Sequence, residues 1–402
     1  MMCEICVICD HDITKKPRSS RMLKLLDMLR HKHRAKMHLN VISKACEQGD
    51  FKALHIQAHL LNFPSDKSSK QRTKAENEMI IKYCEIGDFK PLIFTQNRQI
   101  LPTLLDSLNP QDVLIVEDIT LLPFAVSYKN THTSCKILID LREFYPLEYE
   151  NDTEWLRSFG RFFSHLCQTY LPYVDLAISV SEGLCERYRS EFHIICDIFY
   201  SLPPFFDITP KILQDTKEIK ILYHGFISPD RSSMELLELA ELLCGTHYRL
   251  YIMALSNQRG FLEEFCKRAD SIPTLTMLAP VRLPDIIPTS AQYDIGLIPF
   301  KPTTFNLAHC MPNKLFEYIQ SRLAILTTPL QDVSAFVQSH KCGVITQGFE
   351  VQDIAQSLLN LSIEDINIYK MQAQKAAQKW HLEANLSILE NLLCNKLGIS
   401  IE

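Results

Sequence analysis

Glycine is scarce in this sequence, with 11 residues in a chain of 402. Neither G-x-G-x-x-G nor G-x-x-x-x-G-K-[S/T] occurs. The chain therefore lacks the glycine-rich loops with which dinucleotide-binding dehydrogenases and P-loop nucleotide hydrolases hold phosphates, and both classes are disfavoured. Each glycine that remains is informative, because glycine marks places where the backbone needs unusual freedom.

Long apolar runs and a dominant charge are also missing. No stretch of 18 uncharged apolar residues occurs, so we expect no membrane-spanning helix. The N-terminus, MMCEICVICDHD, carries acidic residues within its apolar stretch, unlike a secretory signal, so we expect a cytoplasmic protein. The net charge of −5 disfavours a uniform surface for nucleic acid.

Cysteine is plentiful, with 14 residues spread along the chain. This spread suits a reducing compartment, in which cysteine acts as a small buried apolar residue. Cys3, Cys6 and Cys9 stand three residues apart, a spacing that invites a metal-site interpretation. They lie in an apolar, β-rich run without a distant partner pair, so we favour a core strand over a metal site.

Apolar strand-like runs alternate with amphipathic helical segments in both halves of the chain. Predicted strands cover 5–9, 38–43, 113–117, 137–140, 175–180, 219–223, 249–254, 274–278, 293–299 and 323–327. Predicted helices cover 19–30, 155–170, 182–189, 233–243, 261–269, 312–320 and 351–359. This rhythm predicts an α/β fold, with parallel sheets that carry helices on both faces.

The proline-rich segment 201–216 is the best candidate for a linker. We therefore expect an N-terminal domain over 1–205, a C-terminal domain over 206–375 and a helical tail over 376–402. The polar stretch 64–78 is expected to be a mobile loop.

Two segments of the second half could hold a phosphorylated ligand. A predicted strand ends at Gly225, and Arg231 follows just before a helix expected from about residue 232. A helix N-terminus and an arginine both favour phosphate, although a surface turn with a solvated arginine fits the same pattern. Lys314 and Glu317 share one face of a predicted helix. They could take a pyrophosphate and a ribose diol, or could form an ordinary helical ion pair.

Several segments of the sequence resemble those of a known enzyme family. The segment Pro312-Asn313-Lys314-Leu315-Phe316-Glu317-Tyr318, with the strand-like 323–328 after it, resembles the nucleotide-sugar signature of GT-B glycosyltransferases of the family-4 type. Segments 14–18, 140–146, 175–188 and 223–231 resemble further family segments, in family order, from about residue 5 to 390. The resemblance implies two Rossmann-like, doubly wound domains that face a cleft, the first for the acceptor and the second for the nucleotide sugar, with the final helix returning toward the first.

The resemblance also implies roles for single residues. Glu317 would hold the ribose hydroxyls, Arg231 and Lys314 would neutralise the diphosphate, and Gly225 would let the backbone approach the phosphates. The other donor-side residues are His309, Pro312, Asn313 and Leu315, and the acceptor-side residues are His11, Asp12, Arg18, Arg142 and Glu143. No cofactor and no essential metal are expected.

The sequence departs from the family pattern in three places. His309 stands where the family often has a glutamate, and Leu236 where it often has a lysine. Asp10-His11-Asp12 replaces a Gly-Gly acceptor loop. The D-x-D form could bind a divalent cation, could contact the acceptor with His11 or Asp12 as base, or could be an ordinary polar strand end.

Basic residues gather between positions 15 and 36, around a helix with an apolar leucine side. They are Lys15, Lys16, Arg18, Arg21, Lys24, Arg30, Lys32, Arg34 and Lys36. This segment could attach the protein peripherally to an anionic membrane surface, or could be a solvated face whose leucines pack on the sheet.

The resemblance predicts a metal-independent, hexosyltransferase-like enzyme. It would move a sugar from a nucleoside-diphosphate sugar to a glycan or lipid-linked acceptor hydroxyl, in bacterial-type surface polysaccharide or glycan biosynthesis. Two alternatives stay open. The chain could be a non-catalytic GT-B-like partner subunit, since His309 replaces the expected glutamate, or it could be a nucleotide-sugar epimerase.

Overall fold

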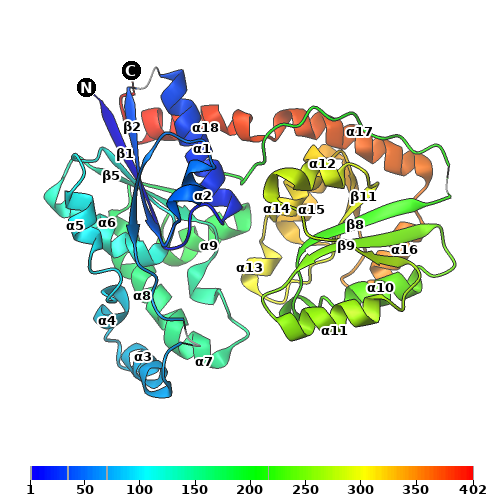
Figure 1. Ribbon diagram of the computed structural model, residues 1–402, viewed down its shortest axis with the longest axis horizontal. Coiled ribbons are helices and arrows are strands. Elements are labelled where there is room, and N and C mark those ends of the chain that lie inside the picture. The colour runs from blue at the N-terminus through cyan, green and yellow to red at the C-terminus, as the bar shows by residue number, and fades with distance from the viewer. Residues whose placement is uncertain (1, 34–35, 69–70, 216, 402) are drawn as a thin grey trace. The chain divides into compact units, whose positions relative to one another are not determined.

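The computed structural model describes residues 2–33, 36–68, 71–215 and 217–401, and the chain forms two compact units (Figure 1). Unit 1 comprises Met1–Ser201, Thr304–Asn306 and Asn385–Glu402, and unit 2 comprises Leu202–Thr303 and Leu307–Ala384. The chain first passes between them inside the proline-rich segment, whose described residues form no helix or strand.

Unit 1 is built on a seven-stranded parallel sheet with the order β3-β2-β1-β4-β5-β6-β7. Its strands are β1 (Cys3–Cys9), β2 (Met37–Lys44), β3 (His59–Phe63), β4 (Val113–Val116), β5 (Lys136–Leu141), β6 (Leu176–Ser179) and β7 (Cys196–Ile198). Its helices are α1 (Pro17–Lys32), α2 (Gln48–Lys52), α3 (Lys74–Ile86), α4 (Lys90–Ile93), α5 (Leu101–Asp106), α6 (Leu122–Thr131), α7 (Thr153–Trp155), α8 (Arg161–Tyr170), α9 (Glu182–Phe192) and α18 (Asn385–Asn391).

Unit 2 is built on a six-stranded parallel sheet with the order β10-β9-β8-β11-β12-β13. Its strands are β8 (Ile219–Phe226), β9 (Tyr248–Leu255), β10 (Leu275–Met277), β11 (Ile295–Ile298), β12 (Ala324–Thr327) and β13 (Gly343–Ile345). Its helices are α10 (Glu235–Leu242), α11 (Arg259–Ala269), α12 (Ile286–Ser290), α14 (Asn313–Gln320), α15 (Gln331–His340), α16 (Val351–Leu359) and α17 (Ile363–Lys379), and the short α13 (Phe305–Ala308) begins in unit 1 and ends in unit 2.

The central strands are buried on both faces, which explains why their sequences are apolar without alternation. Every residue of β1, β4, β11 and β12 is buried. Cys3, Cys6 and Cys9 all lie on β1 with at most 3% of their surface exposed. The α/β fold with two doubly wound parallel sheets is therefore confirmed, and so is the interpretation of these cysteines as part of a core strand.

Each sheet has one place where its strand order reverses. In unit 1 this is between β1 and β4, and in unit 2 it is between β8 and β11. In doubly wound sheets the chain leaves these two strands toward opposite faces, which opens a crevice beyond their carboxyl ends where ligands bind. The residues that follow β1, β4, β8 and β11 therefore lie where doubly wound sheets bind ligands.

The structure corrects several local predictions. Helix α3 begins at Lys74, where Thr73 and Glu76 form a capping box, so the predicted loop over 64–78 is wrong at its end. Helix α10 begins at Glu235 rather than near residue 232, because Ser232 has a left-handed backbone with φ 51°. The predicted helix 155–170 is interrupted by the π-helical turn Leu156–Gly160. Among the helices of the described ranges, none is long and apolar enough to cross a bilayer.

Candidate functional site

Helix α14 is fixed to the sheet of unit 2 by Tyr318. Its hydroxyl accepts the backbone N–H of His224 at 3.1 Å and donates to the carbonyl of Leu222 at 3.1 Å. Gly296 on β11 leaves room for the ring, because a Cβ there would lie 2.4 Å from the Tyr318 ring. This packing sets the first turns of α14 beside the carboxyl end of β8.

Lys314 is the most unusual residue that α14 positions. Its Nζ lies 3.8 Å from the ring centroid of Tyr223 and 4.6 Å from that of Phe300. Only 7% of the residue is exposed, and within the described part of the chain Nζ has no hydrogen-bond partner. Gly225 is adjacent and has φ +124°, and a Cβ there would lie 3.5 Å from Nζ.

The surroundings of Lys314 disfavour the protonated, charged form of its amine. Burial, followed by the nearby charge of Arg231, lowers the pKa of Lys314 well below its usual range. Two aromatic rings offer a cation some attraction, but they do not replace the hydrogen bonds that water would give it. An anion with several oxygen acceptors would supply these bonds.

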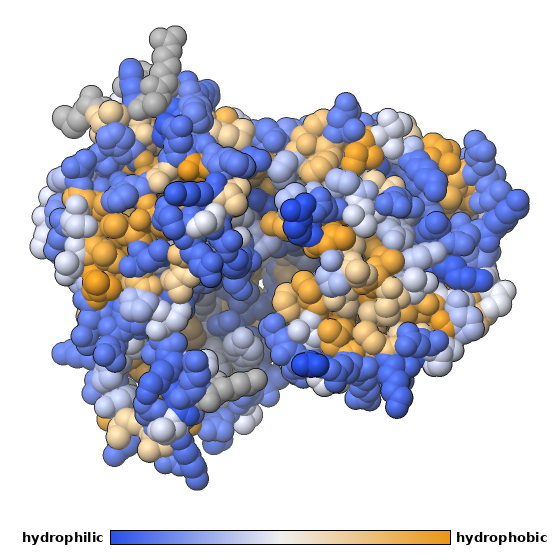
Figure 2. Space-filling view, in the orientation of Figure 1, coloured by the Kyte–Doolittle hydropathy of each residue, from blue (hydrophilic) through white to orange (hydrophobic). Residues whose placement is uncertain are grey.

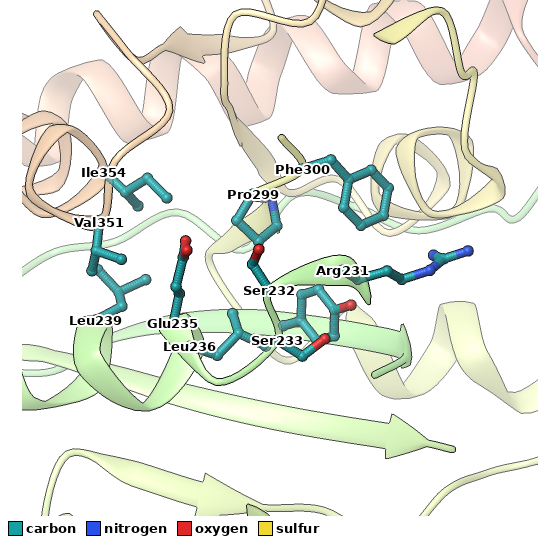
Figure 3. Close-up of a pocket in the computed structure, with 11 residues that line it drawn as sticks. Arg231, Ser232, Ser233, Glu235, Leu236, Leu239, Pro299, Phe300, Val351 and Ile354 are labelled. Atoms are coloured by element: carbon teal, nitrogen blue, oxygen red, sulfur yellow. The ribbon is translucent and has the colours of Figure 1, made fainter. Parts of the chain in front are cut away.

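Arg231 lies on the same side of unit 2 as Lys314. It ends the 3₁₀ turn Pro229–Arg231, is exposed, and places its guanidinium carbon 5.6 Å from the Phe300 centroid. The turn is closed by Ser233, whose hydroxyl accepts the N–H of Ser228 at 3.0 Å. A pocket adjoins this turn, with Arg231 at one end and Val351 and Ile354 at the other (Figure 3).

Glu317 lies one turn along α14 from Lys314 and is 4% exposed. Its Oε2 is 3.6 Å from Nε2 of His224, a residue at the carboxyl end of β8. Burial lowers the pKa of His224 to about 4, so this imidazole is neutral near pH 7. Glu317 also acts on the pKa of Lys314, so the carboxylate, the lysine and Arg231 belong to one group.

We refer to Tyr223, Gly225, Arg231, Phe300, Lys314 and Glu317 as the Lys314 cluster. The other predicted donor-side residues lie around it or below it. His309 is bonded through Nδ1 to Asp332 at 2.8 Å. Pro312 is the N-cap of α14 and Asn313 its first residue, both partly exposed, whereas Leu315 has no exposed surface and packs in the core.

The D-x-D segment after β1 is already engaged within unit 1. Asp10 pairs with Lys44 at 3.0 Å and with Arg98. Asp12 accepts the N–H of Thr14 at 2.9 Å and its hydroxyl at 2.6 Å, which closes a turn. Throughout the described ranges, no three His, Cys, Asp or Glu side chains are grouped as metal ligands would be.

The other acceptor-side residues divide into two kinds. Arg18 makes a buried two-bond ion pair with Asp140, at 2.5 and 2.7 Å, so its charge is used within the fold. Arg142 follows β5 with Nη2 3.5 Å from Asp118, and Glu143 offers its backbone carbonyl to Tyr188 at 2.7 Å. His11 is partly exposed, and its Nε2 lies 2.9 Å from the hydroxyl of Ser19.

The described arginines of the basic segment 15–36 are engaged within the fold, whereas its lysines are exposed. Arg18, Arg21 and Arg30 are buried, and Arg21 and Arg30 bind Ser201 and Asp27. The leucines of α1 are also buried, so its apolar side faces the core. Arg34 lies outside the described residues. The exposed basic side chains of this segment are Lys15, Lys16, Lys24, Lys32 and Lys36.

Sequence reasoning missed several members of these sites. Tyr223 and His224 immediately precede Gly225, so their position at a strand end was an available signal. Phe300 gave none, because an aromatic residue after a strand usually packs in the core. In unit 1 the missed residue is Glu117, which directly follows β4, has no exposed surface and accepts the Ser19 hydroxyl at 2.6 Å.

In sequence the chain matches no protein-family model and no curated protein. In structure it is similar to HepE of Anabaena in complex with UDP and glucose, with 13% identity over 96% of this chain and 99% of that one and a TM-score of 0.64. It is also similar to S. aureus TarM with fondaparinux, α-GlcNAc-glycerol and UDP, with 9% identity over 99% and 100% of the chains and a TM-score of 0.71.

A third similar structure is the lipopolysaccharide outer core galactosyltransferase WaaB, with 9% identity over 98% and 99% of the chains and a TM-score of 0.63. At such identities the likeness concerns the fold. The chain therefore has the two-domain α/β fold of GT-B glycosyltransferases.

Proposed function

We propose that this chain is a glycosyltransferase that transfers a hexose-type sugar from a nucleoside-diphosphate sugar to an acceptor hydroxyl. The observation that supports this most is the buried Nζ of Lys314, which has no hydrogen-bond partner among the described residues and stands beside Arg231 at a strand-order reversal. Two cations with one carboxylate beside them fit a diphosphate that carries a ribose.

Each member of the Lys314 cluster has a role in this proposal. Lys314 and Arg231 neutralise the diphosphate, where negative charge develops as the bond to the sugar breaks, so they stabilise the transition state. Glu317 accepts hydrogen bonds from the ribose hydroxyls. Gly225 lets the phosphates approach, because a side chain there would point at Nζ of Lys314. Since two protein cations do this work, we propose that no metal is essential.

The acceptor class rests on the structural neighbours. Two of them hold UDP, one of these with glucose, and TarM also holds a glycan and a glycosylated glycerol. WaaB is named as acting on the lipopolysaccharide outer core. We therefore propose that the acceptor is a glycan or lipid-linked glycan, that unit 1 binds it, and that the reaction serves surface polysaccharide or glycan synthesis in the cytoplasm.

The burial pattern of helix α1 gives little support to the prediction that this helix attaches the protein to a membrane surface. A helix that lies in a membrane interface exposes an apolar face, whereas the leucines of α1 are buried and the visible surface around it is predominantly hydrophilic (Figure 2). The exposed lysines of the segment are the remaining basis. Binding to vesicles with and without anionic lipid would decide this part of the proposal.

The experiment for the proposal is a panel of nucleotide sugars, with release of nucleoside diphosphate measured with and without lipid extract. Arg231→Ala should reduce turnover of the preferred donor at least about 100-fold, the size expected for loss of one charged transition-state contact. Glu317→Ala should also reduce this turnover, because the ribose hydroxyls would lose their carboxylate partner. Arg259→Ala is the matched control, because the side chain of this arginine of unit 2 is 92% exposed and pairs with Glu263 on its own helix.

Full activity of the first two variants would contradict the assignment of the site. Binding of a diphosphate without turnover of any sugar would favour the non-catalytic partner subunit. Conversion of the nucleotide sugar without an acceptor would favour the epimerase.

A further inference from the structure

The chain segment that follows β5 in unit 1 builds an exposed aromatic surface. Tyr149 is 58% exposed, and its ring meets the ring of Trp155 edge to face, with the centroids 5.5 Å apart. Trp155 is partly exposed and stacks on Phe163 at 5.9 Å. Phe163 in turn stacks on Tyr145 at 5.8 Å. We refer to these four residues as the Tyr149 platform, which runs from solvent into the fold.

The backbone around the platform fixes the positions of its rings. Asp152 accepts the N–H of Trp155 at 3.0 Å, and the π-helical turn Leu156–Gly160 follows. Gly160 allows this turn to pack closely, because a Cβ there would lie 3.3 Å from the carbonyl of Pro146 and 3.4 Å from the Trp155 ring. Short π-helical turns are frequent at functional sites. The exposed rings are therefore held in place before any ligand binds.

Polar side chains surround the buried end of the platform. The Tyr145 hydroxyl has no hydrogen-bond partner among the described residues, although only 3% of the residue is exposed. Burial raises the pKa of this hydroxyl, and the charges of Arg142 and Asp118 act on it next. The hydroxyl therefore faces this polar group. A buried polar atom without a partner costs stability unless a bound group completes it.

Glu148 belongs to the same polar group. It immediately precedes the exposed tyrosine in the sequence and is partly exposed itself. Burial, followed by the charges of Glu143 and Asp118, raises the pKa of Glu148 to about 7. Arg142 and Lys16 act in the opposite direction. The group thus offers carboxylates, which accept hydrogen bonds, and an arginine, which donates them.

An aromatic face beside such a polar group fits a sugar ring. A pyranose has an apolar C–H face, which packs on an aromatic ring, and an edge of hydroxyls, which bind carboxylates and arginine. A phosphorylated ligand fits less well, because the three carboxylates of the group outnumber its two cations and repel an anion. The same carboxylates disfavour a lipid chain, which offers them no hydrogen bonds.

The position of the polar group in the sheet indicates which sugar of the acceptor it meets. Arg142 directly follows β5, and β4 lies between β5 and β1. Neighbouring strands are about 4.8 Å apart, so the end of β5 lies about 10 Å from the end of β1. One sugar ring bound at the reversal between β1 and β4 does not extend past this point to the platform.

We propose that the Tyr149 platform and the polar side chains beside it form a subsite for a non-reacting sugar ring of the acceptor, so that the acceptor is an oligosaccharide or longer glycan. The ring stacks on Tyr149, and its hydroxyls bind Glu148 and Arg142. The inference rests on the proposed function for the reaction, and goes beyond it in stating how much of the acceptor unit 1 holds.

The binding test is a panel of immobilised neutral di-, tri- and tetrasaccharides, probed with the full chain. The wild-type protein should bind at least one of them, and methyl glycosides of the single sugars should not displace it. Tyr149→Ala should weaken this binding about tenfold, the size of one aromatic contact, whereas Tyr149→Phe keeps the ring and the affinity. Tyr173→Ala is the matched control, because Tyr173 is 53% exposed and precedes β6, at the amino end of the strands.

The kinetic test uses the preferred nucleotide sugar with the bound oligosaccharide as acceptor and, separately, with glycerol. Tyr149→Ala should raise KM for the oligosaccharide about tenfold and leave kcat unchanged, which marks a group that binds substrate without acting in the transition state. With glycerol, which is too small to reach the platform, the variant and the wild-type protein should have the same kcat and KM.

The outcomes separate the subsite from the proposed function. If no oligosaccharide binds, if single sugars displace it, or if Tyr149→Ala binds as well as the wild-type protein, the subsite is overturned, and turnover with glycerol would still support the transferase. If Tyr149-dependent oligosaccharide binding appears but no nucleotide sugar is turned over, the transferase fails and the subsite stands.

Discussion

Each of the two sheets has a buried ionisable side chain at the point where its strand order reverses, a lysine in unit 2 and a glutamate in unit 1. In unit 2 the reversal between β8 and β11 presents a lysine whose Nζ is buried without a hydrogen-bond partner among the described residues. In unit 1 the reversal between β1 and β4 presents a carboxylate with one unbonded oxygen. Unit 2 lowers the pKa of its cation, and unit 1 raises the pKa of its anion.

The difference shows how one topology can be specialised. A buried cation without partners is relieved by an anionic ligand, whereas a buried carboxylate is relieved by a proton. Both groups cost stability in the ligand-free protein, and such costs are typical of functional sites. Four measurements test this difference between the two units.

The largest effect should come from a second buried lysine of unit 2. Lys370 is bonded to Asp294 at 2.9 Å, and both residues are at most 1% exposed. Lys370→Met should lower the free energy of unfolding of unit 2 by about 3–5 kcal/mol, because it leaves the Asp294 charge uncompensated. Native-state hydrogen exchange of the β11 amides would measure this, and an unchanged value would show that the pair contributes nothing.

Glu117→Gln should change how stability depends on pH. The pKa of Glu117 is raised to about 7 in the folded state, so between pH 5 and 7 the folded protein binds more protons than the unfolded one. This contribution to stability is present at low pH and is lost as pH rises through 7. Urea unfolding of the wild-type protein should therefore show a decline, by roughly 1–3 kcal/mol, that the variant lacks.

A decline of equal size in the Glu117→Gln protein would mean that other groups cause it. Glu148→Gln measured in parallel would identify the nearest of these, since its carboxyl titrates in the same range.

Lys314→Met should stabilise unit 2, in contrast to Lys370→Met. Removal of a buried amine whose Nζ has no hydrogen-bond partner among the described residues should raise the free energy of unfolding by about 1–2 kcal/mol. Because the pKa of Lys314 is lowered in the folded state, the unfolded protein binds more protons, and the penalty shrinks as pH rises. The gain should therefore be larger at pH 6 than at pH 9. A loss of stability at both values would show that Lys314 has a structural partner.

The sequence predicts the central strands well and the sheet edges poorly. Runs such as 113–117 and 323–327 are apolar because both faces of a parallel sheet are covered. Of the four edge strands, β10 was predicted over 274–278, whereas β3, β7 and β13 were not. The three missed strands contain five, three and three residues and are only partly buried, so their sequences lack a continuous apolar run.

The residues of the two candidate sites also differ in how far the sequence predicts them. The sequence places Lys314 and Glu317 on one helix face, and the resemblance adds Arg231 and Gly225. Neither the sequence nor the resemblance shows that Lys314 is enclosed by Tyr223 and Phe300, because those contacts depend on tertiary packing. Glu117 looks like an ordinary polar strand end, and its burial depends on Ser19, which is 98 positions away in the sequence.

The central claim is that Lys314 binds a nucleoside diphosphate, and titration calorimetry with a panel of nucleoside diphosphates tests it most directly. One of them should bind the wild-type protein with uptake of a proton, seen as a heat that depends on the buffer, since the anion restores the lysine charge. Lys314→Met should then bind it at least about 30-fold more weakly, the value of a charged hydrogen bond. Equal affinity of the two proteins, without proton uptake, would contradict the account.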